Sequence, residues 1–309
     1  MASALPAGDP PSTRSVAFAT PAEAPRWKRW LLFSPLARIL WFVAMFVAYA
    51  KGTGALVLLL GWTTKSASPL QRALASICIE LIPALVAYLG LVTWFERRRA
   101  NELALRTVPT FGLAGFAGGT LLFSVVVAVL WLAGSYHVVA TNPHPDWIPE
   151  ILVAGICAGL AEEIIMRGVL FRIVEEGLGT WVGLSVSAVV FGWAHIRNPG
   201  ATWWSSAAIA IEAGLLLAML YHVTRSLWAC VGLHAAWNIM QGTVYGIPVS
   251  GTRADGFLVS ARTGPDWLSG GAFGAEASVV ALSLCSLCTI ALLVVALRRR
   301  SIVPAFWRR

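Results

Sequence analysis

The feature that most constrains this chain is a series of apolar runs, each about 20 residues long, which is the length of helix that crosses a ~30 Å hydrocarbon core. Because backbone polar groups in lipid must form their hydrogen bonds internally, such runs predict transmembrane helices. The predicted fold class is therefore all-α, a polytopic transmembrane helical bundle of about eight spans. We place the spans at about 38–61, 73–95, 111–134, 150–172, 181–196, 203–222, 227–246 and 276–297.

The composition agrees with a membrane protein and excludes two other classes. Hydrophobic residues make up 58% of the chain and charged residues 12%. A soluble domain carries about a quarter charged residues, and a disordered chain is poor in apolar ones. The net charge of +8 raises the question of nucleic acid binding. However, the Lys and Arg residues lie at the ends of the apolar runs and form no stripe with interleaved aromatics. We therefore expect membrane lipids, and no nucleic acid, as partners.

The chain divides into a tail, a membrane domain and a short second tail. Residues 1–26 are rich in Pro, Ala and Ser and lack an apolar core, which predicts a disordered cytoplasmic tail and no signal peptide. Residues 27–300 form the predicted transmembrane domain, and residues 301–309 a C-terminal cytoplasmic tail. The Gly-rich stretch 247–275 predicts a long loop whose role the sequence leaves open. No internal repeat of the kind found in many transporters is visible.

The basic residues predict the orientation of the bundle, because Lys and Arg accumulate in cytoplasmic loops. The clusters Arg97–Arg99 and Arg298–Arg300 share one side with both termini in the eight-span topology. The loop Ser135–Pro149, on the other side, holds no Lys or Arg. We therefore predict that both termini are cytoplasmic.

The fourth span carries ionisable groups near its middle, where they are costly and indicate a functional site by default. Glu163 and Arg167 are four residues apart, so on a helix they share a face and can form an ion pair. Glu162 points about 100° away from Glu163 and lacks that partner. This spacing makes Glu162 the candidate general base, with a buried structural network as the alternative.

Two later spans contribute further polar groups. His195 ends the fifth span, where a lone histidine is more often a hydrogen-bonding anchor than a catalyst. His234 and Asn238 are four residues apart in the seventh span, so they project side by side and could donate to a developing oxyanion. Hydrogen bonding between helices is the alternative for this pair. Glu212 could face the same cavity, and Glu80 is unexplained.

The three polar groups, taken together, resemble the CAAX prenyl endopeptidase and bacteriocin-processing (CPBP, Abi) family of intramembrane proteases. The family's motifs EExxxR, FxxxH and HxxxN are all present in that order, beginning at Glu162, Phe191 and His234. The resemblance covers about residues 147–245. It implies an active-site cavity among spans four to seven, and a bacterial inner membrane is the expected location.

The resemblance also implies roles for the motif residues. Glu162 would activate the attacking water with help from His195, His234 and Asn238 would stabilise the tetrahedral oxyanion, and Glu163 and Arg167 would hold the site together. Some family members are labelled metalloproteases, and Glu162, His195 and His234 could ligate zinc. We favour a site without a metal or other cofactor, because the HExxH pair is absent and Asn238 is a poor zinc ligand.

Three functions from different classes fit these observations. The leading one is an intramembrane endopeptidase that hydrolyses a peptide bond of a membrane-associated or lipidated protein, with a water activated by Glu162. The second is a proton-coupled transporter in which buried Glu and His side chains form a relay. The third is a catalytically silent immunity or scaffold protein that binds peptides. Loss of Glu162 separates the third from the other two, because only the third tolerates it, and a transport assay in proteoliposomes separates the first two.

Overall fold

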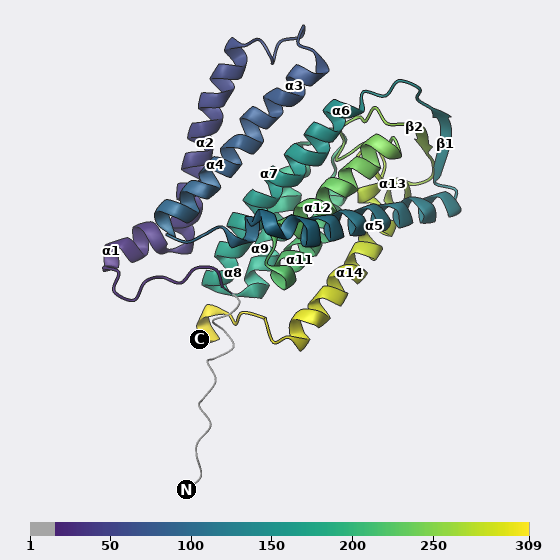
Figure 1. Ribbon diagram of the computed structural model, residues 1–309. Coiled ribbons are helices and arrows are strands. Elements are labelled where there is room, and N and C mark those ends of the chain that lie inside the picture. Colours follow the sequence, from purple (N-terminus) through teal and green to yellow (C-terminus); the bar gives the residue numbers. More distant parts are fainter. Residues whose placement is uncertain (1–15, 309) are drawn as a thin grey trace.

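The computed structural model describes residues 16–308 and shows a bundle of long helices with one small antiparallel sheet (Figure 1). The predicted all-α bundle is confirmed. Most of the predicted N-terminal tail, residues 1–15, and the last residue of the C-terminal tail lie outside the described residues. Two short turns of helix, α1 (Arg26–Lys28) and η1 (Arg29–Phe33), precede the first long helix.

Each predicted span coincides with a helical segment. Some segments contain turns of wider π-helix, which are labelled η. The segments are α2 (Pro35–Leu59); α3 (Pro69–Ser76), η2 (Ile77–Leu81), α4 (Ile82–Gly90) and η3 (Leu91–Phe95); α5 (Leu113–Leu132); α6 (Trp147–Glu150), η7 (Ile151–Ala158), α7 (Gly159–Glu163), η8 (Ile164–Phe171) and α8 (Arg172–Leu178); α9 (Thr180–Ala194); α10 (Trp203–Ile209), η10 (Ala210–Leu215) and α11 (Leu216–Thr224); α12 (Leu227–Asn238) and η11 (Ile239–Val244); and α14 (Val279–Arg298).

Five of the segments are long and apolar enough to cross a membrane: Pro35–Leu59, Pro69–Phe95, Leu105–Leu132, Trp203–Thr224 and Val279–Arg298. The other three predicted spans are helical but fall short of that test for physical reasons. The α6–α8 segment carries several charged residues, α9 has only 15 residues, and α12 with η11 contains polar side chains. These three segments are also the ones that carry the sequence motifs.

Local sequence signals explain where several helices begin. Ser34 caps α2 by accepting a hydrogen bond from the Ala37 N–H, and Pro35 occupies the first turn, where its missing N–H costs nothing. Ser68 and Gln71 form a capping box at the start of α3. Ser278 caps α14 through the Ala281 N–H. Each capped start lies next to a predicted span boundary.

Glycines bring α5 and α12 into backbone contact. A Cβ atom added at Gly115 or Gly119 would clash with the carbonyl oxygens of Ala229 and Leu233, and one added at Gly232 would clash with the carbonyl of Gly112. Small residues that allow such an approach are the usual means of helix association in membranes. Figure 1 shows α5 crossing the bundle in front of α12. This contact holds in place the helix that bears His234 and Asn238.

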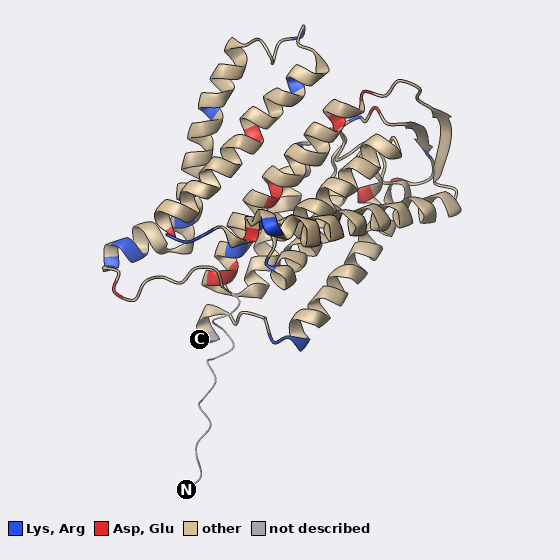
Figure 2. Cartoon of the chain, in the orientation of Figure 1, with Lys and Arg blue, Asp and Glu red and all other residues tan. Residues whose placement is uncertain are grey.

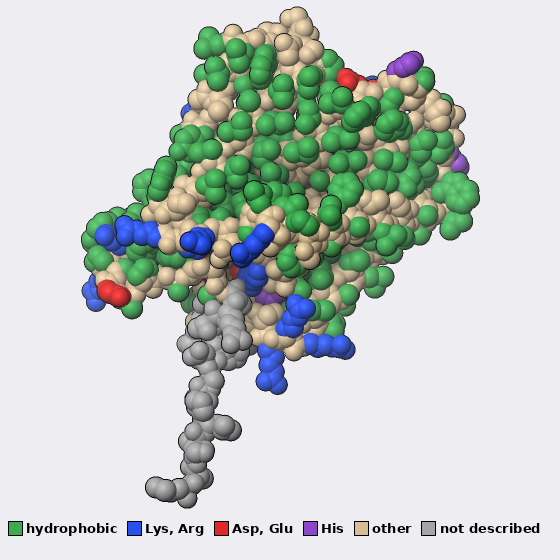
Figure 3. Space-filling view, viewed as in Figure 1, with side chains coloured by type: hydrophobic (Ala, Val, Ile, Leu, Met, Phe, Trp, Pro, Cys, Tyr) green, Lys and Arg blue, Asp and Glu red, His purple; other side chains and the backbone are tan. Residues whose placement is uncertain are grey.

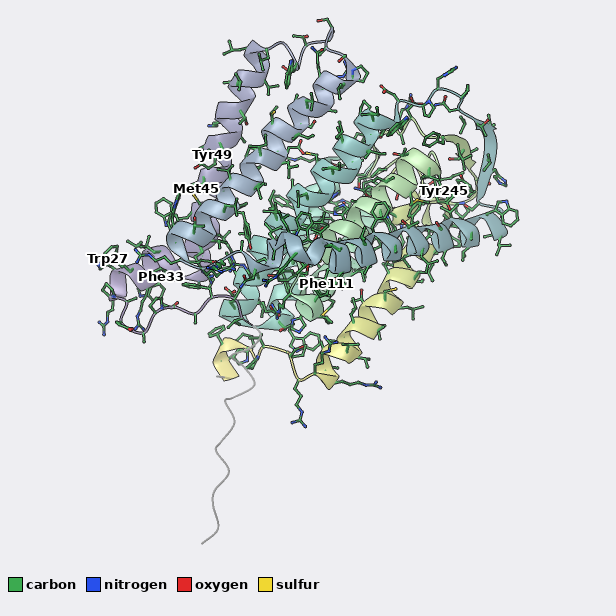
Figure 4. The ribbon with its side chains drawn as sticks, viewed as in Figure 1. Trp27, Phe33, Met45, Tyr49, Phe111 and Tyr245 are labelled. Carbon is green, nitrogen blue, oxygen red and sulfur yellow. The ribbon has the colours of Figure 1, made fainter. Side chains whose placement is uncertain are left out.

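The small sheet lies at one end of the bundle. Strand β1 (Tyr136–Thr141) pairs antiparallel with β2 (Leu258–Arg262), which belongs to the long loop after η11. The Tyr136 hydroxyl donates to the Tyr245 carbonyl over 3.0 Å, and Tyr245 is labelled beside this sheet in Figure 4. The predicted loop 247–275 is therefore fixed to the α5–β1 connection through a strand.

The opposite end of the bundle is rich in basic residues, and we call it the basic end. It comprises α1 and η1, the connection Arg97–Arg106, the turn at Arg225, and the residues from Arg298 to the C-terminus. Figure 2 shows blue Lys and Arg gathered there. Figure 3 shows apolar side chains covering most of the visible face beyond it, as expected for a surface that contacts lipid. The charge distribution predicted from the sequence is thus present in three dimensions.

A buried ionic network joins four segments at the basic end. Arg38 of α2 bonds Glu96 and Glu176, each over 2.8 Å, and Arg172 of α8 lies 3.0 Å from Glu96. Arg98 bonds Glu96 and Glu102, each over 2.7 Å. The side chains of Arg172 and Glu96 are fully buried. Because each buried charge has an opposite partner, the network stabilises the contact between α2, the connection that follows η3, and α8.

Both tails also contact the basic end. The N–H groups of Ala17 and Phe18 donate to Glu176 over 3.1 and 3.2 Å, and the Val303 N–H donates to the Thr180 hydroxyl over 2.9 Å. Residues 17 and 18 belong to the segment for which the sequence predicts disorder, and the structure shows them hydrogen-bonded to Glu176. Hydrogen bonds to a buried carboxylate explain the difference, because composition alone does not reveal them.

We expect the network to make stability depend on pH. Burial disfavours the charged forms of Glu96 and Glu102, but the nearby guanidinium groups, including Arg98 and Arg172, outweigh it and hold the pKa of each carboxyl below its ordinary value. A lowered pKa in the folded state adds stability that is complete above the unfolded value of about 4.3. That stability is lost as the pH falls through the folded pKa. Thermal unfolding in detergent should therefore show a Tm that drops below about pH 4.

The Glu96→Gln/Glu102→Gln variant provides the control for this pH effect. Its Tm should lie below that of the wild type at neutral pH, and the difference between the two should shrink in acid. A difference that stays constant or grows as the pH falls would contradict the assignment of the acid sensitivity to this network.

Candidate active site

A cavity of about 400 Å³ lies where the motif-bearing helices meet. It is lined by all four of the predicted reactive side chains, which are Glu162, His195, His234 and Asn238. The cavity lies among spans four to seven, as expected. Two further elements contribute to its wall: the first part of the Pro69–Phe95 helix, and the loop around residues 249–253 together with Glu276.

Glu163 faces away from the cavity and is fully buried. Its Oε1 accepts hydrogen bonds from Arg167 Nη1 and His234 Nδ1, each over 2.8 Å. The predicted ion pair with Arg167 is therefore present. The bond to His234 was not predicted, and it connects the fourth and seventh predicted spans directly. Because a carboxylate can only accept, His234 Nδ1 carries a proton.

Arg167 is held by more than its carboxylate partner. Its Nη2 donates to the Ala213 carbonyl over 2.8 Å, and its guanidinium lies 4.8 Å from the centre of the Phe191 ring. Ala213 lies in the π-helical turn η10, and its carbonyl also accepts the Leu216 N–H. Arg167 thus connects the fourth, fifth and sixth predicted spans, which agrees with the structural role expected for it.

Glu162 differs from Glu163 in its burial and in its hydrogen-bond partners. It lines the cavity and is partly buried, and its Oε2 has no hydrogen-bond partner among the described residues. The helix turn of about 100° between adjacent residues places the two carboxylates on different faces. One of them is committed to a buried network, and the other is available to a molecule in the cavity.

His195 follows directly after α9 and also lines the cavity. Its Nδ1 lies 2.7 Å from the Phe191 carbonyl, which can only accept, so Nδ1 carries a proton. In the neutral ring Nε2 then has a free lone pair and can accept a hydrogen bond from water. The Phe191 and His195 rings lie 4.7 Å apart, so Phe191 contacts both His195 and Arg167.

Asn238 is oriented by the π-helical turn η7. Its Nδ2 donates to the Ala154 carbonyl over 2.8 Å, and Ala154 lies inside that turn. An amide nitrogen carries two hydrogens, so one remains for a molecule in the cavity. Such wide turns often occur at functional sites.

The zinc alternative can be tested against these contacts. Within residues 16–308, no group of three or more His, Cys, Asp or Glu side chains is placed to hold a metal ion. The Nδ1 atoms of His195 and His234 are already bonded to protein acceptors. The Nε2 atoms of the two rings are therefore the nitrogens that remain for water or a metal ion.

Sequence reasoning missed part of the cavity wall. Glu212 was expected as a candidate and does line the cavity, and Glu80, which the sequence left unexplained, lines it as well. Glu150 and Glu276 were not predicted. Glu276 is 3% exposed and accepts a hydrogen bond from the Ser250 N–H over 2.6 Å. An acidic residue directly before the last apolar run was the signal available for it.

Comparison with known families agrees with this geometry. Residues 144–240 match the model of the Rce1-like family, described as type II CAAX prenyl endopeptidase. The matched segment contains all seven motif residues and nearly coincides with the extent of the predicted resemblance. The match agrees with the family indicated by the three motifs and points to a CAAX protease, and the apolar helices indicate an integral membrane protein. A comparison of the sequence with curated proteins gives no match.

Proposed function

We propose that the protein hydrolyses a peptide bond of a membrane-associated or lipidated substrate, with Glu162 as the base that activates the attacking water. One observation carries this proposal: Glu162 lines the cavity and its buried Oε2 has no hydrogen-bond partner among the described residues, while Glu163 bonds Arg167 and His234.

The first step joins water to the peptide carbonyl. A water between Glu162 and His195 Nε2 would donate one hydrogen bond to each. Glu162 takes a proton as the water oxygen attacks the carbonyl carbon, and the carbonyl oxygen becomes the oxyanion of a tetrahedral intermediate. The intermediate then collapses as Glu162 returns the proton to the leaving nitrogen and the C–N bond breaks. The products are a carboxylic acid and an amine, and Glu162 is regenerated.

His234 and Asn238 would stabilise the oxyanion. The free hydrogen on Asn238 Nδ2 can donate directly. His234 Nε2 can donate only when the ring carries both protons, and the carboxylate of Glu163 at Nδ1 favours that form. Donors held in place in a low-dielectric site lower the barrier more than donors in water do. Glu163 would therefore set the protonation of His234 as well as hold Arg167.

The proposal is tested with purified protein in proteoliposomes and a mixture of synthetic peptides, some carrying a C-terminal farnesyl cysteine. We expect new peptide termini by mass spectrometry, and we expect cleavage to continue in a strong zinc chelator. No step in the mechanism uses a metal, so the rate should not change when the chelator is added.

Two outcomes would contradict the proposal. Loss of cleavage in chelator with recovery on added zinc would show a metal-dependent reaction. Proton-coupled uptake of a solute without any new peptide terminus would favour the transporter. We further propose that both termini lie in the cytoplasm of a bacterial cell, because the basic end carries both described chain ends.

A further inference from the structure

The cavity has a clear direction along the bundle. Its outer rim is formed by Pro69, Arg72, Pro149, Glu150, Ser250 and Arg253. Each of these residues lies at a helix start or in a loop at the end opposite the basic end, where the sheet also lies. Among residues 16–308, none of the basic-end segments contributes to the lining.

The same direction appears along each helix that enters the site. In the α6–α8 segment, the last lining residue towards the basic end is Glu162, and the residues from Glu163 to Val169 that follow are mostly buried. In the α10–α11 segment it is Leu217, followed by buried Ala218 and Met219. The cavity therefore reaches about halfway through the bundle. Between Glu162 and Leu217 and the basic end, the bundle is closed.

The half of the bundle between the cavity and the basic end is closed by side-chain packing and by buried ion pairs. Phe171 and Tyr221 are fully or almost fully buried, with ring centres 6.0 Å apart. Arg172 lies next to Phe171 in the sequence and takes part in the buried ionic network of the basic end. Opening a passage through this half would break several buried ion pairs, which is costly. A substrate therefore reaches Glu162 from the end of the bundle opposite the basic end.

The distribution of Lys and Arg indicates which side of the membrane the cavity rim faces. Because Lys and Arg accumulate on the cytoplasmic side, the basic end faces the cytoplasm and the rim faces away from it. We infer that the substrate is a membrane-anchored peptide segment exposed on the non-cytoplasmic face of the membrane. This inference rests on the proposed function. It excludes a lipidated C-terminus held at the cytoplasmic leaflet, because such a peptide would meet the closed half.

Cysteine labelling tests the direction of the cavity without any assay of activity. Ser76→Cys places a thiol on the cavity wall, and Arg299→Cys places an exposed thiol at the basic end. In intact spheroplasts, a membrane-impermeant maleimide should label Ser76→Cys but not Arg299→Cys. In inverted vesicles the pattern should reverse. The wild type, with its five native cysteines, gives the background for both.

Labelling of Ser76→Cys only from the cytoplasmic side would overturn the inference. A second reporter, Arg253→Cys on the exposed rim, covers the case in which Ser76→Cys fails to fold. Labelling of Arg253→Cys only from the cytoplasmic side would overturn the inference equally.

Sealed proteoliposomes separate this inference from the proposed function. Arg299→Cys labelling gives the fraction of molecules in each orientation. Cleavage of externally added peptide should follow the fraction whose basic end faces the lumen. Cleavage that follows the opposite fraction would leave the protease in place and refute the direction. The expected labelling pattern without cleavage from either side would support the direction and refute the protease.

Discussion

The Glu162→Gln variant should lose about 10²–10⁴-fold in cleavage rate while the protein remains folded and inserted, which is the usual contribution of a positioned general base. Gln keeps the size of the side chain and cannot take a proton from water. Because Glu162 Oε2 has no partner among the described residues, its replacement breaks no hydrogen bond at that atom. The rate is measured with the peptides that the wild type cleaves, and the fold by thermal unfolding in detergent.

The exposed Glu23 provides a control for this variant, and Glu23→Gln should cleave at the wild-type rate. Full activity in Glu162→Gln would remove the proposed base from the mechanism. Retained biological activity in Glu162→Ala, with no cleavage in either protein, would favour the silent immunity or scaffold protein.

The Glu163→Gln variant should behave differently, with a loss of stability of about 3–5 kcal/mol together with loss of activity. Glu163 and Arg167 are both fully buried, and removing the carboxylate leaves the Arg167 charge without its ionic partner. The amide oxygen can still accept from His234 Nδ1, but the negative charge that faces this nitrogen is lost. The measurement is the free energy of unfolding by denaturant in mixed detergent micelles.

A double variant distinguishes the cost of an isolated charge from the value of the pair. Glu163→Gln/Arg167→Met removes both charges, and it should recover much of the stability lost in Glu163→Gln, because a buried pair is often replaceable by apolar groups. Activity should not recover, since a neutral amide still replaces the carboxylate that bonds His234 Nδ1. Equal stability of Glu163→Gln and the wild type would contradict the role given to this pair.

The sequence predicts the local part of the site well. Glu163 and Arg167 meet because residues four apart share a helix face, and Glu162 is separated from them by the same geometry. His234 and Asn238 line one cavity for the same reason. The sequence also contains the signals for the helix starts at Ser34, Ser68 and Ser278, because capping depends on adjacent residues.

Contacts between distant residues could not be derived from spacing. The bond between Glu163 and His234 joins residues 71 positions apart and depends on how α7 and α12 approach each other. That approach is set by packing at Gly159 against Ala235 and by the glycines of α5. The π-helical turns are a second example. They contain the carbonyls of Ala154 and Ala213, which accept from Asn238 and Arg167, and no periodicity in the apolar pattern marks these turns.

The same reasoning explains why Glu276 was missed and Glu212 was only a candidate. Both line the cavity through a loop and a helix outside the motif residues, and their charges lie close enough to interact. The sequence shows that a buried carboxylate is costly but not which other carboxylate it meets. The membrane-embedded charges thus identified the site, and the packing of the helices determined its members.

The central claim is hydrolysis, in which a water held by Glu162 supplies an oxygen to the new carboxyl terminus. The most direct measurement is cleavage in water labelled with heavy oxygen, followed by mass spectrometry of the products. Wild-type protein should give product carboxyl groups that carry one labelled oxygen, and Glu162→Gln should give no labelled product above background. Equal labelled product from Glu162→Gln, or cleavage by the wild type without incorporation of the label, would contradict the mechanism.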